Sequence, residues 1–296
     1  MHLITFLDAG DYHVGVLDRA TNEVVDLALA ASGLPTDMTA FIALGAPGLA
    51  VARHAMAGGS GRRPLAEVHS VAPIVRPRRN LFCVGKNYRA HAREIRSLGS
   101  GSDDTRDGIP TLPIIFTKAT SSVIGPGAPI PAWLDATASV DYEGELAVVI
   151  GQGGRGITRG AAMDHVYGYT IVNDVTSRIL QTRHQQWFLG KSLDGFCPMG
   201  PALVTADAVP DVSRLRLQTW VNGELRQDAR IADLIFDIPT LIETLSRSIT
   251  LEPGDIIATG TPAGVGVGYS PPRYLKPGDR VTISIDPIGI LENPVE

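Results

Sequence analysis

Short hydrophobic runs bounded by Gly, Pro, Asn and Asp dominate the chain, and this pattern predicts a fold that is mostly β. The first strands are predicted at residues 3–7, 12–17 and 24–27. The pair Asn222-Gly223 predicts a hairpin after one of the later runs. Those later runs have few helical patterns between them and lie at residues 81–84, 114–117, 145–150, 166–172, 202–205, 215–221, 256–259 and 280–285.

Helical patterns are confined to a few segments, which we predict at residues 38–44, 49–56, 88–98, 175–188 and 238–248. A glycine-rich breaker at residues 58–61 and the prolines between Pro73 and Pro77 mark the best domain boundary. We therefore predict a mostly β (α+β) fold class. A small N-terminal α+β domain is expected over residues 1–72, and a strand-dominated, rolled-up domain with few helices over residues 73–296.

Composition narrows the class of protein. Hydrophobic residues make up 44% and charged residues 19% of the chain, which is ordinary for a soluble globular protein. The net charge of −5, without a dominant basic stripe, argues against nucleic-acid binding. We see no signal peptide and no membrane-spanning run, so no membrane partner is expected. Cys83 and Cys197 lie far apart beside apolar residues, and we expect two reduced thiols and a cytoplasmic protein.

Two glutamates, Glu143 and Glu145, open the most apolar predicted strand. Residues i and i+2 of a strand share one face, roughly 6.5–7 Å apart along the chain. Burying both carboxylates is costly unless a cation or protons neutralise them, and oxygen ligands suit Mg²⁺, Mn²⁺ or Ca²⁺. A bare Glu-x-Glu pair can also be the solvated face of an edge strand, which remains the simpler alternative.

A third acid, Asp174, lies where a predicted strand ends and a helix begins. Its simplest role is to cap that helix, since Asp is favoured at an N-cap. With Glu143 and Glu145 it would instead complete a set of three carboxylates for a divalent ion. Arg178 and Gln181 follow on one helix face within two turns of Asp174.

His91 and Glu94 are three residues apart on a predicted helix, so the carboxylate can orient the imidazole as a general base. An incidental surface pair is the alternative. Lys191, among Gly and Phe residues, could be a fixed positive charge at a developing enolate or a snorkelling surface lysine. The turn around Thr261 could hold a substrate carboxylate or be only a turn.

These residues belong to an ordered series of motifs that resembles the fumarylacetoacetate hydrolase family over about residues 73–296. Residues 1–72 resemble the small N-terminal region of bacterial members. The chain departs from the family pattern at Lys86, at Lys118-Ala119, at Ile179 and in the residues after the dyad, where a lid insertion is expected at 98–107. The motifs are Cys83-Val-Gly-Lys-Asn-Tyr88 with His91 and Glu94, Ser121-Ser-Val-Ile-Gly-Pro-Gly127, Asp141-Tyr-Glu-Gly-Glu-Leu146, Gly168-Tyr169 with Asn173-Asp174, Lys191-Ser192 with Phe196-Cys-Pro-Met-Gly-Pro201, and Thr259-Gly-Thr-Pro-Ala-Gly-Val-Gly266.

The resemblance implies a β-roll catalytic domain in a homodimer. It implies a divalent ion, Mg²⁺ or Mn²⁺ with Ca²⁺ as a further option, held by three carboxylates. A His–Glu dyad on a mobile lid segment would activate water. In residues, the resemblance implies metal ligands Glu143, Glu145 and Asp174, catalytic residues His91, Glu94 and Lys191, and substrate-binding residues Arg178, Gln181, Thr261 and Tyr88.

From this resemblance we predict a metal-dependent hydrolase that cleaves a C–C bond in a small 2-oxo or diketo acid through a metal-bound enolate. The substrate would be a 1,3-dicarbonyl acid such as an acylpyruvate, a fumarylpyruvate-like acid or a diketo-deoxy sugar acid, as in the catabolism of aromatic compounds. An oxaloacetate-type decarboxylase and a 2-hydroxyhepta-2,4-diene-1,7-dioate-type isomerase are alternatives on the same site, because both pass through the same enolate.

Two readings from other classes are weaker. The segment Gly151-Gln-Gly-Gly-Arg-Gly156 fits G-x-G-x-x-G after a strand, which would indicate an NAD-dependent oxidoreductase. Glu143 and Glu145 spoil that strand for a dinucleotide-binding fold, and no helix is expected to start at the glycines. A metal-holding binding protein without turnover would not need the pair His91 and Glu94.

Overall fold

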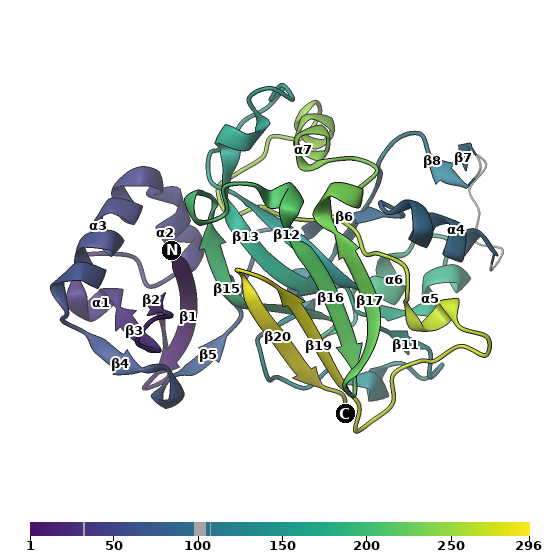
Figure 1. The fold of residues 1–296 in the computed structure, drawn as a ribbon, viewed down its shortest axis with the longest axis horizontal. Coiled ribbons are helices and arrows are strands. Elements are labelled where there is room, and N and C mark those ends of the chain that lie inside the picture. The colour runs from purple at the N-terminus through teal and green to yellow at the C-terminus, as the bar shows by residue number, and fades with distance from the viewer. Residues whose placement is uncertain (32, 98–104, 107) are drawn as a thin grey trace.

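Strands make up most of the regular structure, as the short hydrophobic runs predicted. A computed structural model describes residues 1–31, 33–97, 105–106 and 108–296 (Figure 1). The lid insertion expected at 98–107 falls mostly on residues outside this part of the chain. Both cysteines, Cys83 and Cys197, are buried free thiols. Among the described residues, no helix has the length and apolar character needed to cross a membrane.

A 12-stranded sheet runs through the molecule, and its main path has the order β4-β3-β2-β1-β15-β13-β12-β18-β6-β9. Its central strands β12 and β13 are buried along their whole length, because most of their residues are apolar on both faces. The strands are β1 (His2–Asp8), β2 (Asp11–Asp18), β3 (Glu23–Asp26), β4 (Arg62–Pro64), β5 (His69–Val71), β6 (Leu81–Gly85), β9 (Ile114–Lys118), β10 (Val123–Ile124), β12 (Gly144–Ile150), β13 (Val166–Asn173), β15 (Cys197–Thr205) and β18 (Ile256–Ala258).

A second, four-stranded sheet packs against this one and closes the roll. Its order is β17-β16-β19-β20, and its inner residues share one core cluster with β12 and β13. The predicted hairpin joins β16 to β17, with positive φ at both Asn222 and Gly223 as a two-residue turn requires. The strands are β16 (Arg216–Val221), β17 (Glu224–Arg230), β19 (Arg280–Ile285) and β20 (Gly289–Pro294).

Two short ribbons complete the β structure. In one of them β11 (Val140–Asp141) pairs antiparallel with β14 (Thr176–Ser177), which brings Asp141 opposite Thr176. The other pairs β7 (Thr105–Arg106) with β8 (Ile109–Pro110). The β11–β14 ribbon joins the segment before β12 to the segment after β13, so it fixes the two chain segments that carry the predicted acids.

The N-terminal part forms one side of the molecule, drawn in purple in Figure 1. Its strands continue the large sheet, because β1 pairs with β15. The domain boundary at residue 72 stays a prediction. Helices cover this part at α1 (Leu27–Ala30), α2 (Met38–Ala43) and α3 (Gly45–Gly58). The last two lie close to the helices predicted at 38–44 and 49–56, whereas α1 was not predicted.

The remaining helices are α4 (Arg89–Ser97), α5 (Arg178–Arg183), α6 (Phe188–Lys191) and α7 (Ile238–Ser246). The single helix predicted over 175–188 is wrong, because Thr176 and Ser177 pair with β11 and only α5 and α6 are helical. After β12, the glycine segment 151–156 forms bends and leads to a 3₁₀ turn at Ala162–His165. A dinucleotide-binding helix N-terminus is therefore absent from this described segment.

Candidate active site

Three buried carboxylates meet at one end of the central strand pair. Glu143 precedes β12, Glu145 is its second residue and Asp174 follows β13. Since Gly144 pairs with Asn173, the antiparallel register brings the three acids together. One oxygen from each lies within 4.8 Å of the others, and all three side chains are buried. The solvated edge-strand alternative for Glu143 and Glu145 is therefore wrong.

Buried cations surround these acids. Lys191 Nζ donates to Glu143 Oε2 at 2.7 Å and to Asp174 Oδ2 at 2.6 Å. Lys118 Nζ donates to Asp174 Oδ1 at 2.7 Å, to Val175 O at 3.0 Å and to Lys191 O. The helix-cap alternative for Asp174 is therefore wrong, since its carboxylate binds two lysines and α5 begins after Ser177.

Lys191 is also not a snorkelling surface lysine. Its side chain is buried, and its ammonium lies 4.9 Å from the centre of the Phe116 ring. Burial alone would lower the pKa of Lys191, but the charges of Asp174 and Glu143 outweigh it and raise that pKa. Lys191 is therefore a fixed positive charge inside the cluster.

The acids differ in how well their charges are offset. Burial would raise the pKa of Glu143, but the charges of Lys191 and Arg178 outweigh it and lower that pKa. For Glu145, burial and the charges of Asp174 and Glu143 raise the pKa well above its usual range, although Gly260 N donates to its Oε2 at 2.8 Å. Glu145 is the acid that most needs a further cation.

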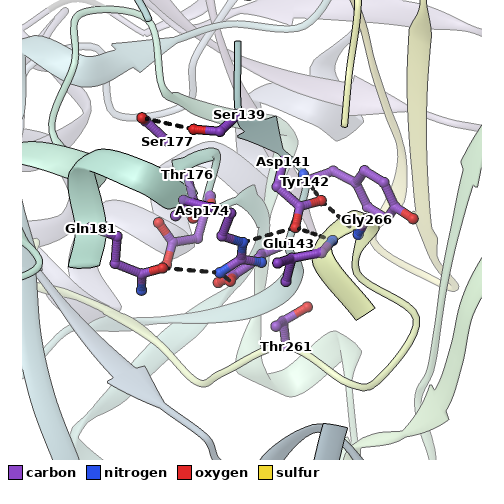
Figure 2. Close-up of polar contacts among 12 residues, drawn as sticks. Ser139, Asp141, Tyr142, Glu143, Asp174, Thr176, Ser177, Gln181, Thr261 and Gly266 are labelled. Atoms are coloured by element: carbon purple, nitrogen blue, oxygen red, sulfur yellow. Dashed lines mark hydrogen bonds and ion pairs between the residues drawn. The ribbon is translucent and has the colours of Figure 1, made fainter. Parts of the chain in front are cut away.

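Arg178 completes the cationic side of the cluster and is itself held by a fourth acid, Asp141. Its Nη1 lies 2.6 Å from Glu143 Oε1, and its Nε donates to Asp141 Oδ2 at 2.8 Å. Gln181 Oε1 accepts a long hydrogen bond of 3.3 Å from Nη1, as Figure 2 shows. Within the described part of the chain, the buried Nη2 of Arg178 has no hydrogen-bond partner. A donor left in this way is suited to an acceptor on a ligand.

The cluster therefore holds four buried carboxylates, Asp141, Glu143, Glu145 and Asp174, and three buried cations, Lys118, Lys191 and Arg178; a fourth buried cation, Lys86, lines the same cavity. If all seven groups of the cluster are ionised, the set carries one net negative charge, and its converging donors are all oxygens. A divalent cation such as Mg²⁺ or Mn²⁺ fits this chemistry, and Glu143, Glu145 and Asp174 are the residues placed to hold it.

The predicted dyad forms on α4. His91 Nδ1 lies 3.0 Å from Glu94 Oε2, and both side chains are mostly buried. The other oxygen of Glu94 accepts from Gly264 N at 3.0 Å, which ties the dyad to the glycine-rich loop after β18. The carboxylate thus fixes the ring orientation, so Nε2 is the nitrogen placed for proton exchange. An incidental surface pair would be neither buried nor anchored at its second oxygen.

A cavity of about 250 Å³ joins the dyad to the acid cluster. His91, Glu143, Glu145, Arg178 and Lys191 all line it, so it brings most of the predicted site residues together. An apolar wall faces them, in which Phe116 and Trp187 pack edge to face at 5.3 Å. The further lining residues are Val84, Gly85, Lys86, Ile95, Ile179, Gln181, Thr182, Thr261, Val267 and Tyr274.

Two predicted substrate-binding residues lie differently from the rest. Thr261 lines the cavity, but its hydroxyl donates to Gly144 O at 3.0 Å and accepts from Gln227 Nε2 at 2.7 Å. Tyr88 is buried and does not line the cavity, and its hydroxyl has no partner among the described residues. Burial, with a smaller contribution from Glu145, raises the pKa of Tyr88.

Sequence reasoning missed Lys118 and Asp141 as members of the site. Asp141 could have been found, because residues 141, 143 and 145 alternate in one run and so point the same way in an extended chain. Lys118 ends an apolar strand and gives no local signal for partners 56 and 73 residues away.

Comparison with known proteins gives a consistent picture. Residues 80–296 match the family model described as fumarylacetoacetate (FAA) hydrolase C-terminal. The chain is 53% identical to oxaloacetate tautomerase YisK of Bacillus subtilis over 237 aligned residues. The aligned region covers 80% of this chain and 76% of that protein.

Several solved structures match along the whole chain, and two of them illustrate the likeness. Fumarylacetoacetate hydrolase (EaFAH) from the psychrophilic Exiguobacterium antarcticum has a TM-score of 0.83 and 42% identity, covering 100% of this chain and 99% of that one. Maleylpyruvate hydrolase from Sphingobium sp. SYK-6, in complex with manganese(II) and pyruvate, has a TM-score of 0.79 and 34% identity, covering 100% and 98%. The shared fold therefore includes the N-terminal part.

Proposed function

The chain belongs to the fumarylacetoacetate hydrolase family, and from that premise we propose an enzyme that interconverts the keto and enol forms of a small 2-oxo dicarboxylic acid of the oxaloacetate type. One observation carries this proposal: the His91–Glu94 dyad, the three-carboxylate cluster and the unpartnered Nη2 of Arg178 belong to one site around a small cavity. Its volume of about 250 Å³ is below the usual range for drug-sized ligands, which favours a small acid.

Charge supports an anionic substrate. If the seven groups of the cluster are ionised, they carry one net negative charge, so a bound divalent cation, with Lys86 on the cavity wall, would make the site net positive. When bound by Glu143, Glu145 and Asp174, such an ion would supply Lewis acidity that makes a carbon next to a carbonyl more acidic. Arg178 lines the cavity, where its guanidinium would pair with a substrate carboxylate.

His91 is the residue that moves the proton. Because its Nδ1 faces Glu94, Nε2 would take a proton from substrate carbon 3 in one direction and return it in the other. Lys191, buried between Glu143 and Asp174, would offset the negative charge that develops on the substrate oxygens.

Hydrolysis of a C–C bond in an acylpyruvate or a related diketo acid is the second candidate. The same dyad could deprotonate water instead of carbon, and a similar structure bears the name maleylpyruvate hydrolase and contains manganese(II) and pyruvate. Both candidates need the enol or enolate form of the substrate, and they differ in whether water attacks a second carbonyl.

Separate assays distinguish the candidates. Enol-oxaloacetate is added to the protein with Mg²⁺ or Mn²⁺, and the ultraviolet absorbance of the enol is followed. Products are identified by mass spectrometry, and acylpyruvates and dienedioates are assayed in parallel. We expect faster loss of the enol signal without new carbon fragments, a loss of this effect in His91→Ala, and no change in His54→Ala, an exposed histidine of α3.

The other outcomes are equally informative. Pyruvate formed with a second acid from an acylpyruvate would favour the hydrolase, pyruvate formed from oxaloacetate a decarboxylase, and a shifted double bond in a dienedioate an isomerase. The proposed function is refuted if no 2-oxo acid reacts faster in the presence of the metal-loaded protein than in its absence. It is also refuted if His91→Ala retains full activity.

A further inference from the structure

Asp141 is a buried acid with an unusually complete set of donors. It has no exposed surface and lies at the end of β11, two residues before Glu143. Oδ1 accepts from Tyr142 N at 2.9 Å and from Gly266 N at 2.7 Å. Oδ2 accepts from Val267 N at 3.0 Å and from Arg178 Nε at 2.8 Å. Four donors therefore converge on one carboxylate, as Figure 2 shows in part.

These contacts join two parts of the site that are distant in sequence. On one side is Arg178, whose Nη1 lies against Glu143 and whose Nη2 has no partner within the described residues. On the other side is the loop that contains Gly264, whose N–H holds the second oxygen of Glu94. Asp141 thus contacts the Arg178 guanidinium directly. It also binds the loop whose Gly264 N–H holds Glu94, so it is connected to the dyad through that loop.

The loop has little freedom at this contact. A methyl group on Gly266 would lie 2.6 Å from Asp141 Oδ1 and 2.4 Å from Arg273 O, so a side chain there would push the loop off the carboxylate. One on Gly268 would lie 2.2 Å from Glu94 Oε1. The loop is therefore packed closely against both Asp141 and Glu94.

We infer that Asp141 is a positioning residue for this site: it holds the Arg178 guanidinium, which lines the cavity, in the orientation that pairs with a substrate carboxylate, and it fixes the loop that anchors Glu94. This inference rests on the proposed function only in taking the ligand to be an anion. Asp141 itself does not line the cavity and acts through Arg178 and the loop.

The need for a carboxylate, and not merely a polar side chain of that shape, gives a sharp test. Asparagine is nearly isosteric with aspartate but has one acceptor oxygen and one NH₂ group. In Asp141→Asn the NH₂ must face either Tyr142 N and Gly266 N or Val267 N and Arg178 Nε. One pair of donors is left opposite another donor in either orientation.

Charge and geometry predict opposite results for this variant. Asp141→Asn removes a negative charge beside Arg178, so charge alone would strengthen the binding of an anion. If Asp141 positions the guanidinium, anion affinity falls instead, because Arg178 is free to turn toward Glu143. The lost hydrogen bond is one to a charged group, so we expect the anion affinity to fall about tenfold or more.

The experiment measures binding by calorimetry, first of Mn²⁺ to the metal-free protein and then of pyruvate to the Mn²⁺-loaded protein. Asp255→Asn is the matched control, because Asp255 is also a buried acid that binds an arginine, Arg79, and a backbone amide, that of Glu252, outside the cavity. We expect Asp141→Asn to keep Mn²⁺ affinity within about threefold while losing pyruvate affinity, and Asp255→Asn to keep both.

A double-mutant cycle assigns the effect to Arg178. In an Arg178→Met background, Asp141→Asn should reduce pyruvate affinity by less than about twofold, since the group it positions is gone. If Asp141→Asn does not fold, Asp141→Glu keeps the acceptors but moves them by one methylene, and the same selective loss of pyruvate affinity is expected.

Several results would overturn the inference: unchanged or tighter pyruvate binding in the folded variant, an equal loss in Asp255→Asn, or a loss of Mn²⁺ affinity as large as the loss for pyruvate. A wild-type protein that binds no pyruvate would overturn the premise of an anion site and the inference with it. Wild-type protein that binds pyruvate but turns over no 2-oxo acid would refute the proposed function alone, since the binding comparison still holds.

Discussion

Lys118 offers the most direct test of how the acid cluster is held together. Its side chain has no exposed surface, and its ammonium donates to Asp174 Oδ1 at 2.7 Å, to Val175 O at 3.0 Å and to Lys191 O. In Lys118→Met, the chain keeps a similar shape but loses all three donors. Asp174 would still bind Lys191, but one oxygen and two carbonyl groups would remain buried without this partner.

The structure sets the size of the effect. Removing one partner of a buried ion pair costs about 3–5 kcal/mol, and each unsatisfied buried acceptor costs about 1–3 kcal/mol. The two costs describe partly the same lost contacts, so they are not added. We therefore expect Lys118→Met to lower the free energy of unfolding by about 3–5 kcal/mol. At about 2 °C per kcal/mol, suited to a large domain, Tm should fall by about 6–10 °C.

Thermal and urea unfolding of the metal-free protein, followed by circular dichroism, measure this loss. Lys276→Met is the control, because Lys276 is exposed and its replacement should change stability by less than about 0.5 kcal/mol. The double variant Lys118→Met/Asp174→Asn should be less destabilised than the sum of the two single variants, since neither charge is then left without the other. A loss below about 1 kcal/mol in Lys118→Met, or strict additivity in the double variant, would refute this reasoning.

Three further predictions concern the dyad, the cavity wall and the thiols. His91→Ala should lower turnover by about 10²–10⁴-fold and leave Mn²⁺ affinity near that of the wild type, because His91 is placed as a base and not as a metal ligand. Kinetics measures the turnover and calorimetry the affinity, and an equal loss of both would contradict this role. Gly85→Ala should lower the free energy of unfolding by about 1–3 kcal/mol in thermal unfolding, because its methyl group would lie 2.5 Å from Trp187 Cζ3. The same change should cost less in a Trp187→Ala background, and equal costs in the two backgrounds would count against this contact. Burial raises the pKa of the Cys197 thiol to about 12 and also raises that of Cys83, so both stay protonated at pH 8 and should react with a thiol reagent only at the rate of unfolding; rapid labelling of the native protein would show the burial to be wrong.

The sequence predicted the features that depend on local pattern. The alternating run that contains Glu143 and Glu145 predicted a strand, and its apolar continuation favoured a buried one. The structure confirms the burial and excludes the solvated edge strand that the sequence had left open. Spacing on a helix also predicted the pair His91 and Glu94. In both cases the residues that interact are close in the chain, so periodicity alone places them.

Contacts between distant segments could not be predicted in this way. The helix expected at 175–188 is interrupted because Thr176 and Ser177 pair with Val140 and Asp141, a tertiary contact that overrides local propensity. The backbone amides of Gly260, Gly264 and Gly266 hold Glu145, Glu94 and Asp141. From the sequence this segment was either only a turn or a site for a substrate carboxylate, and neither reading named these protein carboxylates.

The expected partner of Glu145 is the central point of this account. Its pKa is raised because burial and the neighbouring acids Asp174 and Glu143 are not offset by the cations of the site. Either a proton on Glu145 or a cation can offset this charge, and we propose that one divalent cation held by these three carboxylates does so.

Calorimetric titration of metal-free protein with Mn²⁺, repeated on Glu145→Gln and on the exposed control Glu67→Gln, tests this claim most directly. We expect one Mn²⁺ per chain for the wild type and for Glu67→Gln, and a loss of Mn²⁺ affinity above about 100-fold in Glu145→Gln. Replacing a residue that only orients a metal ligand already lowers metal affinity by about 10–100-fold, so replacing a ligand should lower it further. A wild-type chain that binds no Mn²⁺, or a Glu145→Gln variant that binds it as tightly as the wild type, would contradict the account.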